Sequence, residues 1–216
     1  MRRFPWVTAG LAVAGWAVAL APRAAELLQY ERAAVDSGAY WRLLTGQLTH
    51  WTPRMATIDL VMLLITGAWL EIRSRRLFLW TLCTTGLLVG LTVHLWAPAL
   101  ATYRGSSGIA SGLYLAVACF LITDRGPRWL RLSALAALVG FGAKTVWELA
   151  TGGAFFAGPL PPGISAAPAV HLAGAVAAVL CVTVYRRIGS SLEVTERTQP
   201  LFFLFGQLDD AAGPDR

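Results

Sequence analysis

Residues 77–98 read LFLWTLCTTGLLVGLTVHLWAP, a run that contains no Asp, Glu, Lys or Arg. An apolar run of about 20 residues is long enough, as an α-helix, to cross the hydrocarbon core of a bilayer. The basic segment RSRR at 73–76 directly precedes it. The run therefore predicts a membrane-spanning helix, and comparable runs occur on both sides of it.

The chain as a whole has the composition of a membrane protein. It contains 216 residues, of which 56% are hydrophobic and 14% charged, against about 25% charged in a typical soluble domain. The alternation typical of a membrane β-barrel is absent from the sequence. We predict an all-α membrane protein with six spans, at 4–22, 55–71, 77–98, 106–123, 129–150 and 166–185. The first resembles a signal peptide, but with five more runs we interpret it as a retained span.

The arginines predict the orientation of these spans. With six spans, ten arginines fall on one side: Arg2, Arg3, Arg73, Arg75, Arg76, Arg125, Arg128, Arg131, Arg186 and Arg187. Five fall on the other side: Arg23, Arg32, Arg42, Arg54 and Arg104. Because basic residues favour the cytoplasmic side, both termini are predicted to be cytoplasmic. The predicted organisation is a membrane domain at 1–188, with an outer loop at 23–53 on the membrane surface, and a cytoplasmic tail at 189–216.

Several classes of function are excluded at this point. The net charge of +6 follows from arginines at span ends, and no interleaved basic and aromatic stretch indicates nucleic-acid binding. Cys83, Cys119 and Cys181 lie within apolar runs without ligand spacing, so we predict neither a disulfide framework nor a metal site. No cofactor is predicted.

The segment YRGSSGIASG at 103–112 is the first candidate for chemistry. It places Ser107 among Gly105, Gly108 and Gly112 at the start of a predicted span. Glycines allow close approach of backbones, and a helix N-terminus offers free N–H groups to a developing anion. The same spacing of small residues also packs membrane helices without any catalytic role. Both interpretations stay open for this segment alone.

His171 favours the catalytic interpretation. It is an ionisable residue in an otherwise apolar span, where such residues are costly and usually functional, although a buried histidine can also be structural. Ser107 is predicted about 5 Å inside the fourth span and His171 about 8 Å inside the sixth, both from the outer side. At similar depth the imidazole can act as base for the hydroxyl. We expect a Ser107–His171 dyad without a third acid.

These residues resemble motifs of the rhomboid family of intramembrane serine proteases. The motif GSSG at 105–108 is similar to the family's nucleophile motif and HLAG at 171–174 to its base motif. Trp41 and Arg42 resemble its Trp-Arg motif in the first outer loop, which implies a structural role. The resemblance covers about residues 39–187 and implies a six-span bundle in a bacterial inner membrane. It also implies a serine endopeptidase that cleaves membrane-protein substrates within a transmembrane segment.

Within that family the chain is most similar to the rhombosortases. This similarity rests on YRGSSG at 103–108, AKTVWE at 143–148 and the short proline-rich approach to AVHLAG at 169–174. It implies a substrate that carries a C-terminal membrane segment containing Gly-Gly.

One position departs from the family pattern. Many rhomboids place a His, and four residues later an Asn, on the second span to stabilise the oxyanion. The corresponding residues here are Met55 and Asp59. Met55 cannot donate a hydrogen bond, and Asp59 can do so only when protonated, which burial favours. We therefore expect the oxyanion to depend on backbone N–H groups around Gly105, Ser106 and Ser107, with weaker or differently arranged catalysis.

Two charged residues lie inside the fifth predicted span. Lys144 and Glu148 are four residues apart, on one helix face, where opposite charges pair. We interpret them as a structural ion pair, with a direct catalytic role as the alternative.

Two other functions are consistent with the same residues. Met55 would fit an inactive rhomboid-fold protein that binds transmembrane segments. A small transporter or channel would account for Asp59, Lys144, Glu148 and His171 as intramembrane ionisable groups, but it would leave the placement of Ser107 beside His171 unexplained.

Overall fold

A computed structural model describes residues 4–191 except 125, 157, 159, 163 and 165. The predicted tail lies outside the described residues from 192 onward, as do Arg2, Arg3 and Arg125. The elements in chain order are α1 Trp6–Ala19, α2 Pro22–Leu28, β1 Tyr30–Glu31, α3 Arg32–Asp36, α4 Arg42–Thr45, the 3₁₀ helix η1 Gly46–Leu48, α5 Pro53–Arg73, α6 Arg75–Trp96, β2 Thr102–Tyr103, α7 Ser107–Thr123, α8 Arg128–Thr151 and α9 Ala169–Ser191.

The long helices make this an all-α, multi-pass membrane protein. Four of the described helices, α5, α6, α8 and α9, are long and apolar enough to cross a bilayer. A fifth crossing is obtained if α1 and α2 form one broken span. The central helix α7 is apolar but has only 17 residues. The six-span topology therefore stays a prediction, although each predicted span contains a helix.

The helix in the first predicted span, 4–22, ends before the predicted end of the span. Helix α1 stops at Ala19, and the chain then bends by 112° into α2. The cause is Pro22, whose ring excludes helical geometry at the preceding residue, and Ala21 is accordingly non-helical, with φ −121° and ψ 84°. As the first residue of α2, Pro22 needs no hydrogen-bond acceptor for a backbone N–H.

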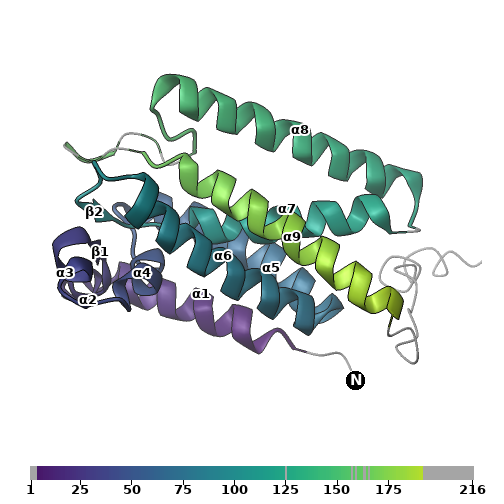
Figure 1. The fold of residues 1–216 in the computed structure, drawn as a ribbon, viewed down its shortest axis with the longest axis horizontal. Coiled ribbons are helices and arrows are strands. Elements are labelled where there is room, and N and C mark those ends of the chain that lie inside the picture. Colours follow the sequence, from purple (N-terminus) through teal and green to yellow (C-terminus); the bar gives the residue numbers. More distant parts are fainter. Residues whose placement is uncertain are drawn as a thin grey trace, which may run out of the picture.

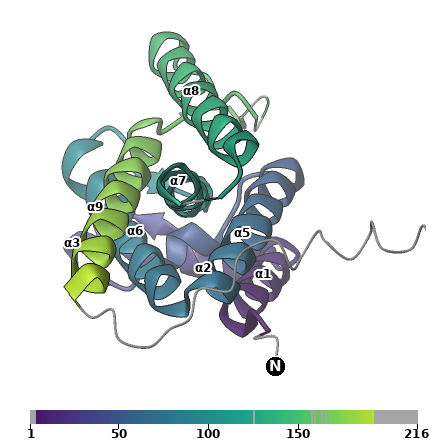
Figure 2. The ribbon, with the colours of Figure 1, turned by 90° about the vertical axis from the view of Figure 1, so that its right-hand side faces the viewer.

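Helix α7 lies at the centre of the bundle. Figure 2 shows it end-on, with α1, α5, α6, α8 and α9 around it. Its buried face is rich in small residues, which allow neighbouring helices to approach closely. Helix α8 stands apart along one side of the bundle (Figure 1) and packs mainly against α7. Most of its large apolar side chains are exposed, as expected for side chains that face lipid.

The segment predicted as an outer loop, 23–53, has its own structure. It contains α2, α3, α4 and η1, and β1 pairs antiparallel with β2, with Tyr30 opposite Tyr103. Arg32 attaches this segment to the end of α6 because its guanidinium donates to the carbonyl oxygens of Val93, His94 and Ala97. The segment is thus fixed beside the start of α7.

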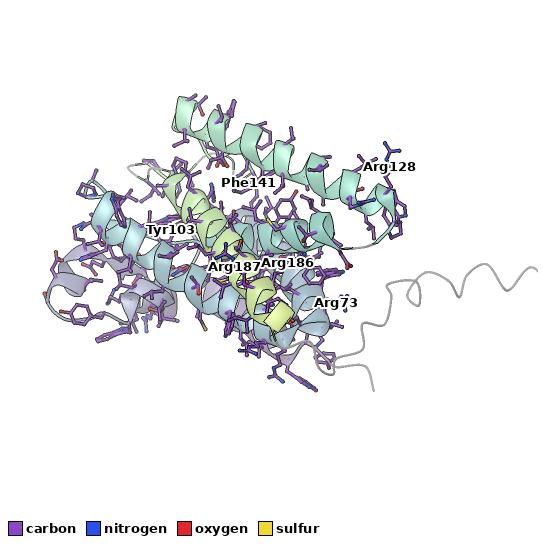
Figure 3. All side chains as sticks on the ribbon, turned by 45° about the vertical axis from the view of Figure 1, so that its right-hand side comes forward. Arg73, Tyr103, Arg128, Phe141, Arg186 and Arg187 are labelled. Atoms are coloured by element: carbon purple, nitrogen blue, oxygen red, sulfur yellow. The ribbon has the colours of Figure 1, made fainter. Side chains whose placement is uncertain are left out.

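Two of the arginines used to predict the orientation lie at the end of the bundle opposite Tyr103. Tyr103 lies at one end, whereas Arg73 and Arg128 lie at the other (Figure 3). Arg73 ends α5 and Arg128 begins α8, so these arginines lie on one side as predicted. Which side of a membrane that is stays a prediction.

A buried carboxylate holds the start of α1. Glu71 of α5 is 3% exposed and accepts hydrogen bonds from the backbone N–H groups of Val7 and Thr8, at 3.2 and 2.9 Å. It also accepts one from the Thr8 hydroxyl at 2.8 Å. N–H groups in the first turn of a helix have no intrahelical acceptor, and Glu71 supplies one.

We expect Glu71→Gln to loosen α1. An amide presents donors where the helix start requires acceptors, so the free energy of unfolding should fall by about 1–3 kcal/mol. Thermal melting of the purified protein in detergent measures this loss. A matched control is Glu31→Gln, which removes an exposed partner of Arg42 and should change stability by about 1 kcal/mol at most. Equal melting temperatures for wild type and Glu71→Gln would contradict the assignment.

Candidate active site

A cavity of about 680 Å³ lies at the Tyr103 end of the bundle. Its walls come from α5, α7, α8 and the start of α9, and they are mainly apolar. Ser107 and His171, which the sequence predicts as a catalytic pair, both line it. Pockets of this size, with few polar groups in apolar walls, are typical of sites that bind organic ligands.

Close backbone packing of α7 against α9 brings the two residues to the same cavity. A Cβ atom added to Gly108 would lie 3.2 Å from the carbonyl oxygen of Val170. A Cβ atom on Gly174 would collide with the carbonyl oxygen of Gly108. Gly108 directly follows Ser107, and Val170 directly precedes His171. The two interpretations of the glycine motif are therefore compatible, because small-residue packing brings the helix start that carries the serine against the helix start that carries the histidine.

His171 is 9% exposed and bonds to α8 rather than to Ser107 in the part of the chain that the structure describes. Its Nδ1 atom lies 2.8 Å from Oε2 of Glu148 and 3.1 Å from Nζ of Lys144. The shorter contact favours an Nδ1–H that donates to the carboxylate, and this tautomer leaves Nε2 unprotonated. Catalytic hydrogen bonds are commonly long before substrate binds.

The predicted ion pair on α8 is present. Nζ of Lys144 donates to Oε2 of Glu148 at 2.7 Å, and the backbone N–H of Phe155 donates to Oε1 of Glu148 at 3.1 Å. Glu148 is 3% exposed. Both oxygens of this buried carboxylate are therefore held, and one of them is shared by Lys144 and His171.

The turn before α7 fixes the position of Ser107. Gly105 has a φ of +149°, a conformation that favours glycine, and a Cβ there would lie 2.6 Å from Cε of Met55. The Tyr103 hydroxyl donates to the Gly105 carbonyl oxygen at 3.0 Å. Burial raises the pKa of Tyr103 most, and the Asp59 carboxylate raises it further. A hydrogen bond with the Ser107 side chain lowers it by less. Tyr103 therefore stays protonated and remains a donor to this turn.

A second Ser–His–carboxylate cluster lies next to the first. Nε2 of His50 is 3.0 Å from Oγ of Ser106 and 3.5 Å from Oδ2 of Asp59. Ser106 is 1% exposed and does not line the cavity, whereas Ser107 and Asp59 do. A nucleophile must reach its substrate, so the geometry favours Ser107 over Ser106. The hydrogen bond between Ser106 and His50 instead stabilises the turn outside the cavity.

The other residues predicted from the rhomboid resemblance, Trp41, Arg42 and Met55, have packing or bracing positions. Arg42 donates to the carbonyl oxygen of Gln29 at 3.0 Å and pairs with Glu31, so it braces the outer segment. Trp41 is 60% exposed and contributes little to that packing. Met55 packs on Gly105, where it offers no hydrogen-bond donor to the cavity.

Two contacts were missed by the sequence analysis. The sequence did not single out His50, and Glu148 was predicted only as the partner of Lys144. The ionisable type of Glu148 inside a span was the available signal. Its contact with His171 joins α8 to α9 across 23 positions of sequence, and helix periodicity carries no information about such a contact.

Comparison with known proteins does not identify a family. No protein-family model and no curated protein matches the chain. Among the described residues, no group of three or more His, Cys, Asp and Glu side chains is arranged to hold a metal ion.

Proposed function

We propose that this protein is an intramembrane serine protease in which Ser107 is the nucleophile and His171 the general base. The observation that carries the proposal is that both residues line one largely apolar cavity while Nδ1 of His171 is held by a carboxylate. A serine hydroxyl within reach of an oriented imidazole is the arrangement that activates serine for acyl transfer.

The reaction follows from this arrangement. Oγ of Ser107 attacks the carbonyl carbon of the scissile peptide bond, and its proton passes to Nε2 of His171. The tetrahedral intermediate then loses the amine, which takes that proton from His171. Water, deprotonated by His171, attacks the acyl-enzyme and releases the carboxylic acid and the free Ser107 hydroxyl. Two peptide fragments form with the consumption of one water molecule.

The start of α7 supplies stabilisation for the oxyanion. Ser107 begins the helix, and the N–H groups of a first helical turn lack intrahelical acceptors. In the proposed mechanism these N–H groups stabilise the negative charge on the tetrahedral intermediate, and the helix dipole adds to their effect. This arrangement compensates for Met55, which offers no donor. Asp59 lines the same cavity and adds a donor only in its protonated form.

The walls of the cavity favour an apolar substrate. A transmembrane segment that enters between α5 and α8 would reach Ser107 without leaving an apolar environment. In the six-span topology with cytoplasmic termini, the site lies near the outer face of a bacterial inner membrane. The substrate would be a membrane-anchored protein, and the rhombosortase resemblance favours a C-terminal segment that contains Gly-Gly.

A serine-reactive fluorophosphonate probe tests this proposal. We expect the purified full-length protein in proteoliposomes to be labelled at Ser107, as identified by peptide mass mapping. His171→Gln should slow labelling by about 10³-fold or more, because the hydroxyl then has no base. The exposed α8 residue Ser133 provides a control, since Ser133→Ala should label at the wild-type rate.

The second candidate is an inactive protein that binds transmembrane segments in this cavity. The absence of a hydrogen bond between His171 and Ser107 in the described chain, together with Met55, favours it. Labelling of Ser107 that depends on His171 would exclude this candidate. Labelling that survives His171→Gln unchanged would instead reject the assignment of the base.

A further inference from the structure

We propose that Glu148 of α8 is a positioning residue that sets the tautomer and orientation of His171, so that the base is ready only while α8 is docked. This inference rests on the proposed function and adds a third residue to a pair predicted to work without an acid. The carboxylate contacts the imidazole of His171, and in the proposed mechanism it acts on Ser107 through that imidazole.

A buried hydrogen bond joins Nδ1 of His171 to the Glu148 carboxylate. Oε2 of Glu148 lies 2.8 Å from Nδ1 of His171, and the side chains of the two residues are 4% and 11% exposed. A buried imidazole whose Nδ1–H donates to a carboxylate keeps its Nε2 lone pair for proton transfer. The same carboxylate stabilises the imidazolium that forms when Ser107 gives up its proton.

The position of Lys144 makes a carboxylate acceptor at Nδ1 of His171 necessary. Its ammonium lies 3.1 Å from the same Nδ1 atom, and an ammonium can only donate a hydrogen bond. If Lys144 donated to Nδ1, the proton of the imidazole would be on Nε2 and His171 could not act as a base. Glu148 prevents this outcome because it accepts from Lys144 at 2.7 Å and from Nδ1 at the same time.

The carboxylate itself is well fixed. Its other oxygen, Oε1, accepts from the backbone N–H of Phe155 at 3.1 Å, so the chain after α8 holds the group from the opposite side. A structural ion pair with Lys144 alone would need neither the Phe155 contact nor the contact with His171. The full set of contacts is that of an orienting group.

The location of Glu148 links the base to helix movement. Helix α8 packs mainly against α7 and carries many exposed apolar side chains, and Figure 2 shows it at the edge of the bundle. Displacement of α8 away from α9 would separate Glu148 from His171. A substrate that displaced α8 on entry would be cleaved only after Glu148 had regained its contact with His171.

The tautomer can be observed directly by NMR. The chain has three histidines, so ¹⁵N-histidine labelling of the full-length protein in detergent gives few signals, and His171→Gln assigns one of them. We expect wild-type His171 to be protonated at Nδ1, and Glu148→Gln to remove this state. An Nε2–H tautomer in the wild type would overturn the proposal, whether or not the protein labels with a probe.

Kinetics separates positioning from simple neutralisation of Lys144. With a fluorogenic transmembrane peptide, Glu148→Gln should lower kcat by about 10²- to 10⁴-fold with little change in KM. Lys144→Met/Glu148→Gln removes both charges, so its melting temperature should recover while kcat stays low. Recovery of kcat in the double variant would show that Glu148 only neutralises Lys144. Absence of labelling at Ser107 in the wild type would reject the proposed function instead, and the NMR result would still decide the role of Glu148.

Discussion

Ser107→Ala is expected to abolish proteolysis while the protein still folds and inserts into the membrane. The hydroxyl is the atom that forms the acyl-enzyme, so its loss should reduce cleavage of a transmembrane substrate by about 10⁴-fold or to background. The N-cap of α7 is Ser106 and not Ser107, and alanine is favourable inside a helix, so Ser107→Ala should change the melting temperature little. Cleavage is measured in proteoliposomes that contain the purified enzyme and a labelled transmembrane peptide.

The adjacent serine makes this experiment decisive. Ser106 bonds to His50 in a cluster that also has a carboxylate, so it is the competing nucleophile. Ser106→Ala should retain Ser107 labelling and lose activity by a smaller factor, since only support for the turn is removed. Full activity of Ser107→Ala with inactive Ser106→Ala would assign the reaction to the second cluster. Full activity in both single variants would reject the serine-protease proposal.

Gly174→Ala is expected to damage both stability and activity. A Cβ at this position would meet the carbonyl oxygen of Gly108 and lie 3.0 Å from the backbone nitrogen of Gly112. Backbone atoms cannot avoid the new Cβ by changing rotamer as a side chain can, so α9 must move away from α7. Such overpacking costs about 1–3 kcal/mol. Because displacement of a catalytic group by about 1 Å can cost 10²-fold in rate, probe labelling of Ser107 should slow by about that factor.

Gly142→Ala is the matched control for this substitution. Gly142 lies in α8, and a Cβ there would have no atom within 4 Å, so alanine should leave labelling unchanged and raise helix stability by at most about 1 kcal/mol. Melting temperature and labelling rate are measured for both variants under the same conditions. If Gly174→Ala behaved like Gly142→Ala, the close packing of α7 on α9 would not be what positions His171.

The sequence predicted the helices well because hydrophobic length is a local property. The predicted run at 77–98 became α6 at Arg75–Trp96, and the run at 55–71 became α5 at Pro53–Arg73. The end of α1 at Ala19, before the predicted end of the span at 22, is also local in origin, because Pro22 disfavours helical geometry at Ala21 and begins α2. Depth along a helix follows from residue number as well, which is why Ser107 and His171 could be predicted at one level of the membrane.

By itself, then, the sequence determined the helical membrane fold and the two residues that line one cavity. Only the tertiary structure decided their partners. His171 meets Glu148 across 23 positions, and His50 meets Ser106 across 56. These contacts depend on which helix faces and loops are turned toward each other, which the sequence pattern does not specify. Hydrophobic periodicity specifies an apolar face but not its neighbour, because lipid and another helix satisfy such a face almost equally well.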